Sequence, residues 1–170
     1  MDLEAFLREN RITAARHAHP PVMTVEESLR LVPHLPGAKT KNLFLRDKKG
    51  ARHLLVTVRH NLAVNISALE SVLGVRGLGF ASPERLAKHL GVTPGSVSLL
   101  ALVNDKTRGV EFVIDRALWE APAVHAHPLR NDATMVLAHA DLERFLAATG
   151  HVPHIIDVPG EVAAPPPVAG

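Results

Sequence analysis

Apolar residues recur along the chain at helical spacing in several places. Leu3, Phe6 and Leu7 follow that spacing, so a helix is expected over residues 2–10. A capping box at residues 24–27 opens a second helix toward residue 32, and Pro33 ends it. Similar start and stop signals predict helices over residues 67–73, 82–90 and 141–149.

Short apolar runs bounded by turn residues predict the strands. Residues 42–46 and 53–58 flank a turn that ends in Gly50, which is typical of a β-hairpin. Residues 98–103 and 110–114 predict a second hairpin, and residues 134–138 and 154–158 predict further strands. Strand pairs separated by helices favour an α/β or α+β fold around a mixed sheet.

The domain organisation predicted from length and composition is simple. A chain of 170 residues buries one sizeable core and is short for two domains. We therefore expect one domain over residues 1–158, whereas residues 159–170 are rich in Pro and Ala and are predicted to form a disordered tail.

Composition excludes several classes of chemistry. The chain has no cysteine, which removes disulfides, thiolate nucleophiles and Cys-based zinc sites. Aromatic residues are 4% of the chain, so base stacking on aromatic side chains is not expected. No run of 18 apolar residues is present and the first residues are acidic, so we expect a soluble, cytoplasmic protein without a membrane partner.

Positive charge is concentrated in one segment although the net charge is only +2. Between residues 39 and 59 there is one acid, Asp47, against seven basic residues: Lys39, Lys41, Arg46, Lys48, Lys49, Arg52 and Arg59. Such a patch can bind phosphate groups. An ordinary solvated hairpin explains the same charges equally well.

Candidate chemistry is sparse because the familiar nucleophile, phosphate-loop and zinc-protease motifs are absent. The sequence His-Ala-His-Pro occurs twice, at residues 17–20 and 125–128, but pocket or surface histidines are a better interpretation than a metal site. Lys41 and Asn42 place a cation and an amide at the start of an apolar strand, and the loop 91–96 can bring backbone N–H groups to a ligand.

Four segments together resemble the YbaK and prolyl-tRNA synthetase-associated editing domain family, and within it the freestanding alanyl-tRNA(Pro) deacylases. The similarity runs in the family's order from about residue 2 to residue 158, and the segments that carry it are 19–27 (HPPVMTVEE), 40–47 (TKNLFLRD), 90–98 (LGVTPGSVS) and 127–134 (HPLRNDAT).

The resemblance implies a single domain with a mixed, barrel-like sheet surrounded by helices. It also implies catalytic roles for Lys41, Asn42 and His127, while the residues expected to contact the aminoacyl group and terminal adenosine are Val22, Met23, Thr24, Gly91, Pro94, Gly95 and Ser96. We expect the tRNA backbone to be held by Lys39, Arg46, Lys48 and Lys49.

The activity implied by the resemblance is hydrolysis of the ester of a mischarged tRNA, with alanyl-tRNA(Pro) as substrate and water as nucleophile. The expected partners are the tRNA(Pro) acceptor end and prolyl-tRNA synthetase; no DNA, cofactor or metal is expected. Three alternatives stay open: a deacylase acting on cysteinyl- or seryl-tRNA, a metal-dependent hydrolase using the His-Ala-His pairs, and a non-catalytic module that binds tRNA or a synthetase.

Overall fold

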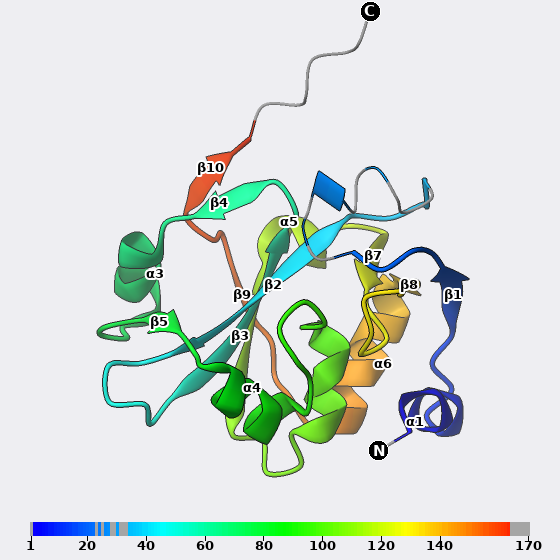
Figure 1. Cartoon of the computed structure of the whole chain (residues 1–170), viewed down its shortest axis with the longest axis horizontal. Helices are drawn as coiled ribbons and strands as arrows, with labels where there is room; N and C mark the ends of the chain where they lie inside the picture. Colours follow the sequence, from blue (N-terminus) through cyan, green and yellow to red (C-terminus); the bar gives the residue numbers. More distant parts are fainter. Residues whose placement is uncertain (1, 23, 25, 28–29, 31–33, 164–170) are drawn as a thin grey trace, which may run out of the picture.

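A computed structural model describes residues 2–22, 24, 26, 27, 30 and 34–163. Its largest sheet has five strands in the order β5-β2-β3-β6-β9 (Figure 1). These strands are β2 (Thr40–Arg46), β3 (His53–Arg59), β5 (Gly79–Phe80), β6 (Val110–Asp115) and β9 (His154–Ile156). The β2 and β3 strands are antiparallel, and β6 and β9 continue the sheet in parallel, so the sheet is mixed.

Two smaller sheets complete the strand set. One has the order β1-β8-β7 and the other pairs β10 with β4. Their strands are β1 (Ala14–Ala18), β4 (Leu62–Val64), β7 (Ala123–Ala126), β8 (Ala133–Ala138) and β10 (Gly160–Val162). The predicted mixed α/β domain is confirmed, but the described strands form three open sheets and no closed barrel.

Helices cover the large sheet and fill the space beside it (Figure 1). They are α1 (Leu3–Glu9), α3 (Ile66–Leu73), α4 (Pro83–Leu90), the 3-10 helix η1 (Leu99–Asn104), α5 (Arg116–Trp119) and α6 (His139–Thr149). None of the helices in the described part of the chain has the length and apolar character needed to cross a membrane.

Two apolar cores form because side chains alternate along β2. Phe44 belongs to the larger core, which α1, α4, η1 and α6 share with the β1-β8-β7 sheet. Leu45 points to the opposite face and belongs to a smaller core with α3 and β4. The same alternation decides which residues at the start of β2 share a face.

Several predicted elements have different ends or a different form. Residues 99–104 are a 3-10 helix instead of a strand, since the Ser98 hydroxyl accepts a hydrogen bond from the backbone N–H of Leu100 and starts a turn. All five residues of 99–103 are buried, and a fully buried run carries no periodicity that separates strand from helix. The N-cap of α3 is Asn65 instead of Ser67.

The end of the domain also differs from the predicted boundary. Gly160–Val162 pairs with β4, so the first part of the segment predicted as a tail is part of the fold. Residues 164–170 lie outside the described residues, as does most of the helix predicted over residues 24–32. At the start of that segment the backbone N–H of Glu27 donates to the Thr24 hydroxyl at 3.0 Å, as the predicted capping box requires.

Candidate functional site

A pocket of about 240 Å³ lies where β2 begins, between the hairpin β2–β3 and the small sheet β1-β8-β7. It is lined by Val22, Thr24, Lys39, Thr40, Lys41, Asn42, His60, Gly95, Val97 and His127. Residues from five segments of the chain thus meet at one place, and all three residues predicted to be catalytic are among them.

The side chain of Asn42 is held in one orientation. Its Oδ1 accepts a hydrogen bond from the Thr57 hydroxyl at 2.6 Å, and its Nδ2 donates to the carbonyl of Val97 at 3.3 Å. An amide nitrogen carries two protons, so one proton of Asn42 is left for a ligand in the pocket.

The tautomer of His127 follows from its hydrogen bond. Its Nδ1 lies 3.1 Å from the carbonyl oxygen of Ala133, and because a carbonyl can only accept, Nδ1 carries the proton. Burial lowers the pKa of His127, so the neutral ring is favoured and Nε2 keeps a free lone pair. His127 therefore presents an acceptor, and not a cation, to a ligand.

Positive charge in the pocket comes from Lys39 and Lys41. Burial lowers the pKa of Lys41, and the described residues form no ion pair with it. Burial and the neighbouring Lys39 also lower the pKa of His60. None of the described lining residues is acidic. The pocket is therefore suited to an anionic or electron-rich ligand.

The loop 91–96 contributes one of its four predicted contact residues to the pocket. Gly95 lines it with a backbone φ of 92°, whereas Gly91, Pro94 and Ser96 do not. Gly91 instead ends α4 in the left-handed conformation, and a Cβ there would come within 2.9 Å of the Asn104 amide. Met23, the remaining predicted contact, lies outside the described residues.

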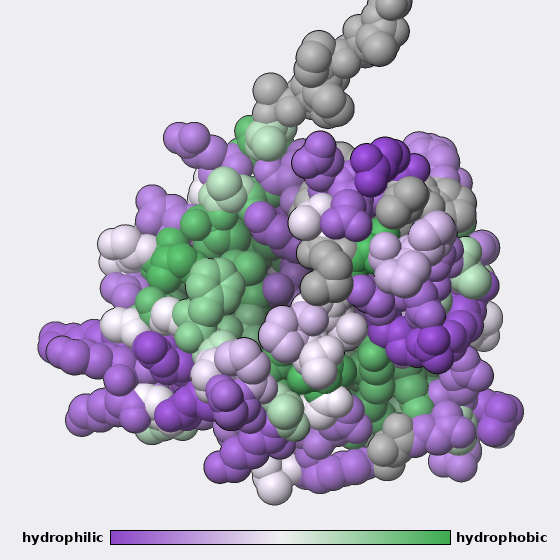
Figure 2. All heavy atoms as spheres, in the orientation of Figure 1, coloured by the Kyte–Doolittle hydropathy of each residue, from purple (hydrophilic) through white to green (hydrophobic). Residues whose placement is uncertain are grey.

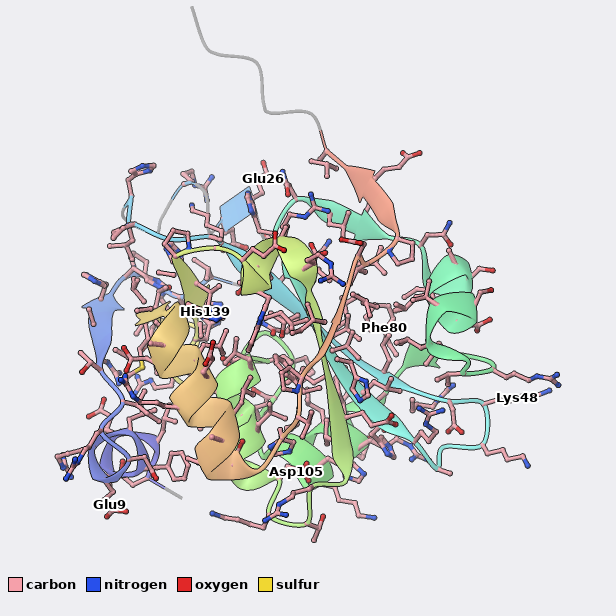
Figure 3. All side chains as sticks on the ribbon, turned by 180° about the vertical axis from the view of Figure 1, so that it is seen from behind. Glu9, Glu26, Lys48, Phe80, Asp105 and His139 are labelled. Carbon is pink, nitrogen blue, oxygen red and sulfur yellow. The ribbon has the colours of Figure 1, made fainter. Side chains whose placement is uncertain are left out.

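The predicted tRNA-binding residues fall into two groups. Lys39 lines the pocket, but Arg46, Lys48 and Lys49 lie at the opposite end of the hairpin, about 20 Å along β2. Figure 3 shows Lys48 at the tip of that hairpin. Two other cations of the segment are neutralised, because Arg52 pairs with Glu111 and Arg59 with Asp115.

The two His-Ala-His-Pro segments lie on either side of β8, on β1 and β7. His19 bonds the Thr134 hydroxyl at 2.9 Å, and His125 donates from Nε2 to the Pro36 carbonyl at 2.8 Å. His19 and His125 thus each have a local polar partner. Within the described ranges, no group of three or more His, Asp or Glu residues is placed to hold a metal ion.

Sequence reasoning missed His60, Thr40 and Val97. The register that pairs Lys41 with Val58 also places residue 60 beside Lys39. The position of His60 next to the pocket could therefore have been predicted from the hairpin. Val97 contributes its carbonyl to Asn42, and no side-chain pattern can reveal a backbone contact across 55 residues.

Comparisons with known proteins relate this chain to an editing domain. A model of the aminoacyl-tRNA editing domain matches residues 19–145. The prolyl-tRNA synthetase associated domain-containing protein 1 of Danio rerio is 43% identical over 157 residues, covering 91% of this chain and 85% of that protein. The prolyl-tRNA editing protein ProX of Acetoanaerobium sticklandii is 39% identical over 147 residues, covering 86% and 90%.

A solved structure has the same fold. It is described as a "putative trans-editing enzyme for prolyl tRNA synthetase", has a TM-score of 0.69 and 21% sequence identity, and the match covers 94% of this chain and 95% of that one. With the family model spanning most of the domain, the chain belongs to the aminoacyl-tRNA editing domain family.

Proposed function

We propose that this protein is a freestanding deacylase that hydrolyses the ester of mischarged tRNA, with alanyl-tRNA(Pro) as its substrate. The observation that carries the proposal is the convergence of Lys41, Asn42, Gly95 and His127 on one cationic pocket. The name of the bacterial relative, a prolyl-tRNA editing protein, supports the same assignment. We place the reaction in the cytoplasm, with tRNA(Pro) and prolyl-tRNA synthetase as partners.

Water is the proposed nucleophile. The chain has no cysteine, and none of the described residues that line the pocket is a serine. Of the two threonines there, Thr40 donates its hydroxyl to the carbonyl of His125 and Thr24 accepts from the backbone of Glu27. The Thr40 hydroxyl has no general base beside it among the described residues, and the Thr24 hydroxyl donates to the Glu27 carboxylate at 3.4 Å within an exposed capping box.

Each polar group of the pocket has a role in this hydrolysis. The Lys41 ammonium and the free amide proton of Asn42 stabilise the negative charge that develops on the ester oxygen when water attacks the carbonyl carbon. The lone pair on His127 Nε2 accepts a hydrogen bond from the attacking water or from the ribose hydroxyl next to the ester. The leaving ribose oxygen then takes a proton, which yields the free amino acid and uncharged tRNA.

Selection of alanine against proline follows from size. A synthetase site made for proline excludes the smaller alanine by only about 1–3 kcal/mol, so a second site that admits only the smaller group is needed. The pocket volume of about 240 Å³ lies below the usual range of ligand pockets, and buried Val22 forms part of its wall. Met23, next to Val22 in the chain, is proposed as a second part of that sieve.

The test is a panel of tRNAs charged with labelled alanine, serine, cysteine or proline and incubated with the purified protein. We expect loss of label from alanyl-tRNA(Pro) and retention on prolyl-tRNA(Pro). Preferred release of cysteine or serine would reassign the substrate. Binding of every tRNA without release of any label would show a non-catalytic module.

A further inference from the structure

Phe80 is an exposed aromatic ring at the edge of the large sheet. Its side chain is 65% exposed. Phe44, Phe112 and Phe145 are buried, whereas Phe6 and Trp119 pack partly against the larger core. The low aromatic content predicted no ring for base stacking, yet the fold leaves this one free on the surface.

Phe80 shares a sheet face with Lys41. It pairs with Leu45 on β2, and side chains two apart on a strand point to the same side, so Lys41, Leu43 and Leu45 lie on the face of Phe80. Four residues of strand separate Lys41 from Leu45, which is about 13 Å. Half-buried Leu43 lies between the pocket and the ring.

Between these points β2 is an edge strand of the described sheet. β5 pairs with β2 only at Leu45 and Arg46, and within the described part of the chain no other strand pairs with this edge of β2 at residues 41–43. Figure 2 shows an apolar patch in the left half of that face, over α3, β4 and β5. The partly buried apolar side chains that these elements and β2 contribute are Leu43, Val64, Ile66 and Leu73.

Cations flank this strip at both ends. Lys39 and Lys41 lie in the pocket, and Arg46 lies at the other end, where it projects from the opposite face of β2 and its Nη1 is 3.4 Å from the carbonyl of Gly77. Lys48 is joined to Arg76 by a backbone hydrogen bond. The ion pairs of the described residues include none of these five cations. An exposed ring between unpaired cations is the arrangement by which proteins hold single-stranded nucleic acid.

We propose that Phe80 is a stacking platform for one of the unpaired nucleotides that precede the esterified adenosine at the 3′ end of the tRNA. This inference rests on the proposed function, because the pocket must hold the aminoacyl ester. The 3′ end then runs from the pocket across Leu43 to the ring, and its phosphates meet the flanking cations. The ring accepts any base, since every base has an aromatic face.

The kinetic test compares two substrates and three variants. With alanyl-tRNA(Pro), Phe80→Ala is expected to lower kcat/KM about 5- to 100-fold through KM, the range that loss of one base stack produces. Phe80→Leu keeps an apolar side chain but is expected to lose nearly as much, whereas Phe80→Trp is expected to retain full kcat/KM. With alanyl-adenosine, which has no preceding nucleotide, the loss is expected to vanish.

Val72→Ala is the matched control, since Val72 is also an exposed apolar residue, at 53%, and lies on α3. It is expected to behave like the parent protein with both substrates. An unchanged kcat/KM in Phe80→Ala with tRNA would overturn the platform, and so would an equal loss with both substrates, which would indicate distortion of the pocket. Full activity in Phe80→Leu would show that only apolar contact matters and would also reject stacking.

A binding measurement separates this inference from the proposed function. The chain has one tryptophan, so the double variant Phe80→Trp, Trp119→Phe carries its only indole at the platform. An uncharged RNA hairpin with the tRNA(Pro) acceptor stem and unpaired 3′ nucleotides is expected to quench its fluorescence, and the same hairpin without those nucleotides is not. Quenching without any deacylation by the parent protein would refute only the proposed function.

A second copy of this chain is the rival occupant of the patch. Sedimentation at micromolar concentration distinguishes the two occupants. If the parent protein and Phe80→Ala are both monomers, a nucleotide is supported as the occupant of the patch. A parent dimer that Phe80→Ala dissociates would overturn the proposal.

Discussion

The hydroxyl of Thr57 donates a 2.6 Å hydrogen bond to the side-chain oxygen of Asn42 on the neighbouring strand. Thr57 is fully buried, so it acts on a ligand only through Asn42. We expect Thr57→Val to release the amide and to lower kcat/KM for deacylation about tenfold, the loss typical of one hydrogen bond to a charged transition state. Thr57→Ser is expected to restore the activity. Equal kcat/KM in all three proteins would show that the orientation of Asn42 is not used.

Removal of the Lys41 ammonium tests the proposed source of oxyanion stabilisation. Lys41→Met is expected to lower kcat about 100-fold or more, because the charge acts where negative charge develops. The melting temperature of Lys41→Met is expected to equal that of the parent protein, since the described residues form no ion pair with Lys41. Arg8→Met on α1 removes one charge far from the pocket and is the control. Normal turnover by Lys41→Met would exclude this lysine from the reaction.

The pH dependence of deacylation tests the role of His127. Its pKa is lowered by burial, so the protonated ring, which has no lone pair at Nε2, forms only below the ordinary histidine range. We expect kcat/KM, after subtraction of spontaneous hydrolysis, to stay level down to about pH 6.5 and to fall at lower pH. His127→Asn is expected to lack this acid limb. An acid limb of the same shape in the variant would assign the titration to another group.

Much of the fold could be predicted because local signals agree with it. The apolar runs of β2 and β3 flank a turn that ends in Gly50, and α4 with its Ser82 cap and α6 followed by Gly150 have apolar positions at helical spacing. The 3-10 helix η1 was not predictable in the same way, because every apolar residue in it is buried and only the cap at Ser98 distinguishes it from a strand.

The site could be predicted only in part, for a related reason. Lys41, Asn42 and His127 belong to segments whose resemblance to the family suggested them, and the structure brings them together. The cationic cluster was expected to be one patch because its members are close in sequence. A hairpin separates residues near its turn from those at its open end, and this geometry divides Lys48 from Lys39.

The adjacent histidines His53 and His89 predict a loss of stability in acid. Their ring centroids are 4.0 Å apart, and Nη1 of Arg85 lies 3.0 Å from Nε2 of His53. Burial lowers the pKa of both histidines. For His53, repulsion from His89 and Arg85 lowers the pKa further, and Asp47 opposes this shift. For His89, repulsion from Lys88 lowers the pKa further, and Asp105 opposes this shift.

Because both folded-state pKa values lie below the unfolded value of about 6.5, the unfolded chain binds more protons as pH falls through that value. The free energy of unfolding is therefore expected to be highest above pH 7 and to decrease from about pH 6.5 downward. Urea denaturation between pH 5 and pH 8 measures this decrease, and His89→Leu is expected to make it shallower. A slope unchanged by the substitution would mean that the pair does not contribute.

Charge reversal at the hairpin tip tests whether the second cationic group reaches tRNA. Lys48 and Lys49 are exposed and lie about 20 Å from the pocket, a distance that the acceptor stem can span only if it runs along β2. We expect Lys48→Glu with Lys49→Glu to weaken tRNA binding and to reduce the salt dependence of log Kd by about one for each phosphate that the variant no longer neutralises. Arg8→Glu with Arg11→Glu changes the net charge equally on the side of the molecule where Figure 3 shows Glu9. If both double variants weaken binding to the same extent, the effect comes from total charge, and the stem does not follow the hairpin.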